Sequence, residues 1–190
     1  MIAILVKHHG VKEIQFFDDN FVLFPKRLTA ICRGLMKYRG QLSWSCQARA
    51  DMINPAMLKL MKQAGCWQIG LGIESGSDKI LKILCKGETK ETIKKAVIMI
   101  AKEGIEVKGF FILGNPGETK ATLKETEEFI LSLPLTYVHT TFFTPFPGSV
   151  IYNKASRWGK FNAKDQWQVL GRGTIEPGAS PSPLPPEKTH

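Results

Sequence analysis

The feature that most constrains the fold is a repeated alternation of short apolar segments with longer amphipathic ones. Five short segments rich in β-branched and aromatic residues are typical of strands, at 13–17, 41–47, 67–73, 106–113 and 137–143. Apolar residues at helical spacing predict helices over 25–38, 55–64, 89–102 and 119–131. Strands that alternate with helices of about ten or more residues form right-handed βαβ units and a parallel sheet.

The length of the chain limits how complete such a sheet can be. An eight-stranded barrel of this kind normally needs about 250 residues, and the chain has 190. We therefore predict an α/β fold, a partial parallel (β/α) TIM-like barrel of about five to six strands with outer helices; an open doubly wound sheet is the alternative. The barrel is expected over residues 1–168, and a disordered Pro/Ser-rich tail over 169–190.

The N-terminal segment reads as the end of a helix that stops at Gly10. A helix with no strand before it predicts a chain that starts within the barrel, after a missing first strand. The segment 13–17 would then have an exposed edge, and such an edge favours self-association.

The composition says more about where the protein resides and what it contacts than about its activity. No apolar run approaches the roughly 18 to 20 residues that span a bilayer, and no signal-peptide pattern is present, so we expect a cytoplasmic protein without membrane contact. The net charge is +9, and residues 1–100 hold 16 Lys/Arg against 8 Asp/Glu. This excess suits an anionic partner such as RNA, although solvated helix faces explain it more simply.

Polar or backbone-bending residues follow each predicted strand. Parallel α/β folds bind their ligands at the carboxyl ends of the strands, where loops and helix N-termini meet. The candidate site residues, in strand order, are Asp18, Asp19 and Asn20, then Arg49 with Asp51, then Glu74 and Ser75, then Gly114, Asn115 and Pro116. Their convergence on one edge of the sheet predicts a binding rim.

Several of these candidates also have a purely structural explanation. The Asp18-Asp19-Asn20 segment could cap the next helix or form an Asx-turn. Arg49 and Asp51 could form a surface ion pair worth under about 1 kcal/mol. Glu74 is harder to explain in this way, because it follows a run that should be buried, where an acid needs a donor or a ligand.

The glycines around Glu74 do not form a nucleotide-binding loop. Gly70, Gly72 and Gly76 lack the G-x-G-x-x-G spacing, and the first two lie inside the predicted strand. No GxxxxGK[ST] motif occurs either. The sequence therefore argues against a Rossmann-type nucleotide binder.

Five segments, taken in order, resemble the radical S-adenosylmethionine (SAM) superfamily. They are VKEIQFFDDNF, WSCQARAD, MKQAGCWQIGLGIESGSDKIL, FFILGNPGET and TPFPGSVIYN. Within that superfamily, the chain is most similar to the group that often carries an N-terminal cobalamin-binding domain. The resemblance covers residues 1 to about 167.

The resemblance implies a role for each part of the rim. The family binds SAM and a 4Fe–4S cluster at the carboxyl ends of the strands of a partial barrel. Asp18, Asp19 and Asn20 stand where many members contact the methionine amino group, and Arg49, Glu74 and Ser75 where members contact the SAM carboxylate or ribose. Gly114, Asn115 and Pro116 stand beside the adenine strand. The family's G-x-I-x-G-x-x-E pattern is incomplete there, since Phe110 and Gly117 replace its first glycine and its glutamate.

The cluster ligands of the family are absent from the sequence. The family holds its cluster with CxxxCxxC, whereas the four cysteines here stand at 32, 46, 66 and 85. This spacing predicts reduced core or near-surface thiols and no metal site. Without ligands the electron source for SAM cleavage is missing.

These observations lead to one main expectation and two alternatives. The main expectation is a truncated radical SAM enzyme of the oxidoreductase, methyltransferase or methylthiotransferase type, inactive in reductive SAM cleavage, whose parent protein could also hold cobalamin. One alternative is a SAM- or nucleotide-binding module without redox chemistry. The other is a basic RNA-contacting domain.

Overall fold

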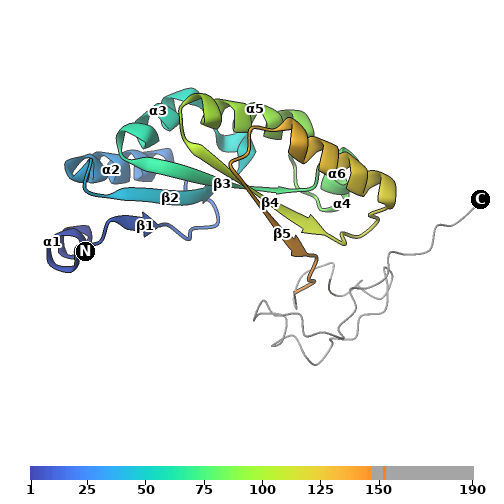
Figure 1. Cartoon of the computed structure of the whole chain (residues 1–190), viewed down its shortest axis with the longest axis horizontal. Helices are drawn as coiled ribbons and strands as arrows, with labels where there is room; N and C mark the ends of the chain where they lie inside the picture. The colour runs from blue at the N-terminus through green and yellow to red at the C-terminus, as the bar shows by residue number, and fades with distance from the viewer. Residues whose placement is uncertain (147–151, 153–190) are drawn as a thin grey trace, which may run out of the picture.

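Five parallel strands form a single sheet in the order β1-β2-β3-β4-β5. The computed structural model describes residues 1–146 and residue 152. The strands are β1 (Glu13–Gln15), β2 (Ser43–Ala48), β3 (Cys66–Glu74), β4 (Glu106–Leu113) and β5 (Tyr137–Phe142). Figure 1 shows the sheet curling like part of a barrel wall, with most helices along one side. This confirms the predicted partial parallel barrel.

The helices follow the predicted pattern: one precedes the first strand, and the others lie between strands. They are α1 (Ile2–His9), α2 (Pro25–Leu35), α3 (Pro55–Gln63), α4 (Asp78–Ile83), α5 (Lys90–Lys102) and α6 (Lys120–Ser132), with short 3-10 helices at Met36–Tyr38 and Ala50–Met52. The end of the helix predicted over 25–38 is thus a 3-10 turn. Helix α4 was not expected, because six residues are too few to show a helical period.

Local capping explains where several helices begin and end. The Asn54 side chain accepts a hydrogen bond from the Met57 amide, and Pro55 opens α3, as the sequence predicts. Thr89 caps α5 in the same way. Gly10 ends α1 with a φ of 63°, a conformation that glycine adopts without penalty.

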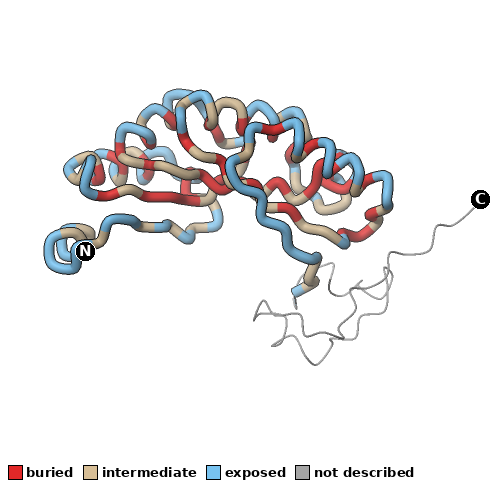
Figure 2. The backbone as a smooth tube through the Cα atoms, in the orientation of Figure 1, coloured by how far each residue is buried: buried red, intermediate tan, exposed pale blue. Residues whose placement is uncertain are grey.

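The core lies between the sheet and the helices. Trp44 of β2 is fully buried, and its indole N–H donates to the Ala64 carbonyl over 2.8 Å. From β3, Ile69, Leu71 and Ile73 enter the same core. Because side chains alternate along a strand, Gly70 and Gly72 belong to the opposite, concave face of the sheet. The strand register shifts between Gly72 and Glu74, and the Glu74 carboxylate lies on the same face as Gly72, since a Cβ atom on that glycine would meet it at 2.7 Å. Figure 2 shows the buried residues concentrated where the helices cover the sheet.

The two outer strands are less covered. Among the described residues, β1 forms one edge of the sheet and β5 the other, and all six residues of β5 are exposed. Within residues 1–146 and 152, no helix has the length and apolar character needed to cross a membrane. The predicted tail over 169–190, and the expected end of the barrel at 168, lie outside the described residues.

Candidate functional site

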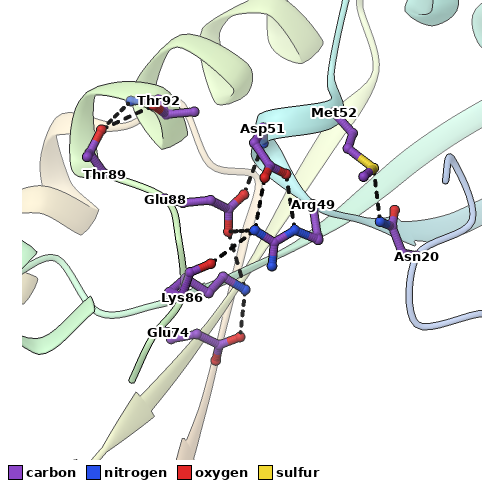
Figure 3. A network of polar contacts seen from close by, with 9 residues as sticks. All are labelled: Asn20, Arg49, Asp51, Met52, Glu74, Lys86, Glu88, Thr89 and Thr92. Atoms are coloured by element: carbon purple, nitrogen blue, oxygen red, sulfur yellow. Dashed lines mark hydrogen bonds and ion pairs between the residues drawn. The ribbon is translucent and has the colours of Figure 1, made fainter. Parts of the chain in front are cut away.

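The carboxyl ends of β2 and β3 carry a connected set of charged side chains. We call Arg49, Asp51, Glu74, Lys86 and Glu88 the rim cluster; Figure 3 shows its members joined by hydrogen bonds and ion pairs. They come from the ends of the two strands, from the 3-10 helix Ala50–Met52 and from the loop after α4. The candidates Arg49 and Glu74 are therefore brought into one cluster.

Arg49 links β2 to the α4–α5 loop. Its guanidinium donates to both carboxylate oxygens of Asp51, over 3.1 and 2.9 Å, and to the Lys86 carbonyl over 3.0 Å. The hydrogen bond from Arg49 is the main reason that the pKa of Asp51 is lowered, and it raises the pKa of Arg49 in turn. The ion pair left open by the sequence thus exists, but it is one part of a larger cluster.

Glu88 lies at the centre of the cluster. Its side chain is fully buried, and one carboxylate oxygen lies 3.5 Å from the Lys86 ammonium and 3.6 Å from Arg49. The other oxygen accepts from the Asp51 amide over 3.0 Å. A buried carboxylate is stable only with such partners. Glu88 in turn fixes the side chains of Arg49 and Lys86 from the interior of the protein.

Glu74 stands at the end of β3 in an unusual backbone conformation. Its φ is 67°, uncommon for a residue with a side chain. Its carboxylate lies 3.3 Å from the Lys86 ammonium. A Cβ atom on Gly72 would come within 2.7 Å of that carboxylate, so the glycine leaves the space in which Glu74 and Lys86 meet.

The first candidate group lies beside the rim cluster without joining it. Asp18 pairs with Arg27 over 2.8 Å and does not cap α2, whose N-terminus has no side-chain cap. Asp19 is exposed. The Asn20 amide nitrogen donates to the sulfur of Met52, in the same 3-10 helix as Asp51. The amide oxygen of Asn20 is buried and has no hydrogen-bond partner among residues 1–146 and 152.

The remaining candidates take part mainly in internal packing. Ser75 is fully buried, and its hydroxyl contacts Thr126 of α6. Asn115 and Pro116 are buried, while Gly114 is exposed at the end of β4. Asn115 donates to the Ile112 carbonyl over 2.6 Å, and its amide lies 3.4 Å from Glu118. Of these four residues, Gly114 is the one that is exposed.

Sequence reasoning missed Lys86 and Glu88, although a signal for them exists. The tripeptide Gly-Glu-Thr occurs at 87–89 and again at 117–119. In both copies the glycine has a positive φ, the glutamate is buried and the threonine caps the next helix. Glu118 accepts from the Gly114 amide over 2.5 Å, much as Glu88 accepts from the Asp51 amide. Each copy therefore closes a loop at the rim.

The four cysteines do not suit an iron–sulfur cluster. Cys32, Cys46 and Cys66 are buried in the core, and Cys85 is exposed in a turn after α4. Burial raises the pKa of Cys32 to about 11 and also raises that of Cys66, which disfavours thiolate ligands. In the part of the chain that the structure describes, no three His, Cys, Asp or Glu side chains are grouped to hold a metal.

A curled parallel sheet with charged residues at its strand carboxyl ends defines the class of (β/α)-barrel ligand-binding proteins. The family follows from a direct match, because the model of the radical SAM superfamily covers residues 1–130. The chain therefore belongs to the radical SAM superfamily. Members of this family use SAM together with a 4Fe–4S cluster. The partial barrel of the family agrees with the fold of this chain.

The chain is also similar to individual proteins and solved structures. An uncharacterised methyltransferase of Pyrococcus horikoshii is 33% identical over 183 residues, which are 92% of this chain and 40% of that protein. The methyltransferase TsrM of Kitasatospora setae, with cobalamin and a 4Fe–4S cluster bound, superposes with a TM-score of 0.64 at 19% identity, over 72% of this chain and 28% of TsrM.

The cobalamin-dependent SAM radical enzyme OxsB, with aqua-cobalamin and SAM bound, superposes with a TM-score of 0.61 at 25% identity, over 80% of this chain and 23% of that one. The chain thus spans less than half the length of each of these relatives.

Proposed function

We propose that the rim cluster binds the methionine end of SAM. The observation that carries this proposal is the charge of the cluster. Arg49 and Lys86 stand against the carboxylates of Asp51, Glu74 and Glu88, two positive groups against three negative ones. The methionine end of SAM has an ammonium, a carboxylate and a sulfonium, a net charge of +1. The two charge sets are complementary, which favours binding.

Each side chain of the cluster would have a separate role in that complex. Arg49 and Lys86 would donate to the SAM carboxylate, for which a guanidinium and an ammonium are suitable donors. Glu74 would accept from the SAM ammonium. Its side chain is 22% exposed, whereas that of Glu88 is fully buried. Glu88 would therefore orient Arg49 and Lys86 without touching the ligand.

Two further observations support SAM as the ligand. The Asn20 oxygen is buried beside the 3-10 helix that carries Asp51 and lacks a partner within the described part of the chain, so it can accept a hydrogen bond from a ligand. Gly114 presents its exposed backbone at the end of β4, beside the strand expected to contact adenine. When bound, SAM supplies an electrophilic methyl group and, on one-electron reduction, its adenosyl group.

The residues described do not fit the cluster that would reduce SAM. Three of the four thiols are buried in the core, and the fourth is separate from them. We therefore assign SAM binding to this chain and assign no electron-transfer step to its residues. For the whole protein we propose a radical SAM enzyme of the methyl-transfer type that uses cobalamin, supported by the description of the Pyrococcus relative and by the cobalamin-bound OxsB and TsrM structures.

Isothermal titration of the full chain with SAM tests the binding proposal. Wild type should bind SAM, and Glu74→Gln should bind it at least about 10-fold more weakly, because the carboxylate charge that pairs with the SAM ammonium is lost. Glu128→Gln serves as the control, since Glu128 is exposed on α6 and pairs only loosely with Lys124, at 3.9 Å. No heat at millimolar SAM, or equal affinities in Glu74→Gln and wild type, would contradict the proposal.

A further inference from the structure

The backbone at Glu74 is held in a strained turn. The Ser75 amide donates to the Ile73 carbonyl over 2.8 Å, so that the chain closes a three-residue turn around Glu74. With a φ of 67° at its central residue, the turn has the sign of the rare, strained γ-turn. Strain of this kind persists only where surrounding contacts enforce it, and it is common at functional sites.

Those surrounding contacts come from Thr126, on the buried side of α6. Its hydroxyl oxygen accepts from the Gly76 amide over 3.0 Å and lies 3.2 Å from the Ser75 hydroxyl. The single hydroxyl proton of Thr126 is directed at the Thr122 carbonyl, 3.0 Å away. Since a hydroxyl has only one proton to donate, Ser75 must be the donor to Thr126.

The Ser75 hydroxyl also accepts from the Ser77 amide over 3.2 Å. The Gly76 amide thus donates directly to the Thr126 hydroxyl on α6. The Ser77 amide is linked to the same hydroxyl through the Ser75 side chain. Thr126 and Ser75 are almost completely buried, so water cannot easily replace these bonds.

Close packing fixes α6 against the same turn. A Cβ atom at Gly76 would lie 2.6 Å from the Thr126 Cα and from the Phe129 Cβ. The backbone of Gly76 therefore rests directly on the helix, and no larger residue fits between them.

We propose that Thr126 is a positioning residue for SAM binding, which acts by holding the Glu74 turn so that its carboxylate faces Lys86 and the ligand. This inference rests on the proposed function, because it assigns Glu74 to SAM. It gives α6, which contributes no residue to the rim cluster, a part in building the site. It also explains why the Ser75 hydroxyl points to the helix.

Three variants of the full chain test the role of Thr126. Thr126→Val keeps the shape but removes the hydroxyl, and should weaken SAM binding about 10-fold, because the turn loses both of its hydrogen bonds to that hydroxyl. Thr126→Ser retains the hydroxyl and should restore the affinity. Thr122→Val is the matched control, because its buried hydroxyl caps α6 and forms its hydrogen bonds with Thr119.

The readouts separate positioning from a general loss of stability. Urea unfolding should show both valine variants destabilised, whereas SAM affinity, measured by titration, should fall only in Thr126→Val. Equal affinities in Thr126→Val and Thr122→Val would overturn the inference. If Thr126→Val does not fold, Ser75→Ala replaces it, with weaker SAM binding expected and unchanged binding contradicting the proposal.

Amide hydrogen exchange gives an answer that does not depend on SAM. The Ser75 and Gly76 amides should exchange faster in Thr126→Val than in wild type, and at wild-type rates in Thr122→Val. If wild type fails to bind SAM, the proposed function fails, while the exchange rates still decide whether Thr126 holds the turn. Unchanged exchange at both amides in Thr126→Val would refute the positioning role.

Discussion

Removing the charge of Glu88 should destabilise the whole fold. Its carboxylate is fully buried and lies 3.5 and 3.6 Å from two cationic groups. Glu88→Gln keeps the size of the side chain and can still accept from the Asp51 amide. Its NH2 group, however, would face Arg49 and Lys86, which are donors themselves.

The expected cost follows from the burial of these groups. Removing one partner of a buried ion pair costs about 3 to 5 kcal/mol. The lower value applies here, because the Arg49 side chain is 33% exposed and both cations keep a second carboxylate, Asp51 or Glu74. With a urea m-value of about 2 kcal/mol per molar, a loss of about 3 kcal/mol lowers the unfolding midpoint by about 1.5 M.

Urea unfolding of the full chain, followed by circular dichroism, measures this effect. Glu128→Gln is the control, because it removes a carboxylate that is 67% exposed and 3.9 Å from its partner, a change expected to cost no more than about 0.5 kcal/mol. If the midpoints of Glu88→Gln and Glu128→Gln fall equally little, Glu88 does not organise the rim cluster, and the reasoning from burial is wrong.

Three further predictions address the cysteines, the pH dependence and the sheet edge. Only Cys85 should react rapidly with a thiol reagent at about pH 8, and all four cysteines after unfolding in urea; fast reaction of two or more thiols in the native state would contradict the buried placement. The pKa of Asp51 in the folded state lies below its ordinary value of 3.8, chiefly through the hydrogen bond from Arg49. Its stabilising effect is therefore present above about pH 4 and lost as the pH falls through the lower, folded-state pKa. Urea midpoints between about pH 5 and pH 2 should then fall less steeply in Asp51→Asn than in wild type, and equal slopes would speak against this. The open edge at β1, next to the 76% exposed Phe17, should cause concentration-dependent association in light scattering that Phe17→Glu weakens; a monomer at every concentration would exclude it.

Strand and helix periods were enough to predict the sheet. Strand β4 has the bounds that its apolar run indicates, and α3 begins at Pro55 after the Asn54 cap. At these places the change from strand to helix depends on residues that are neighbours in the sequence. The sequence alone therefore indicates where it occurs. Local rules therefore predict the alternation of strands and helices, and with it a parallel sheet.

The composition of the rim cluster was harder to predict. The expectation that site residues directly follow strands located Arg49 and Glu74. It could not locate Lys86 and Glu88, because the loop after α4 carries them to the rim from outside any strand end. Ser75 shows the opposite case. It follows a strand, but the positive φ of Glu74 turns the chain, and the Ser75 hydroxyl meets α6. The direction in which a side chain such as that of Ser75 points depends on tertiary packing, which no local sequence pattern shows.

Mapping SAM by amide chemical shifts on the full chain tests the central claim most directly. If the rim cluster binds the methionine end of SAM, the largest shifts should fall on residues 49–51, 74–76 and 86–88. Residues in the middle of α5, on the helical side of the sheet, should stay unchanged. Saturable shifts confined to other surfaces, or none at millimolar SAM, would contradict the assignment of this site.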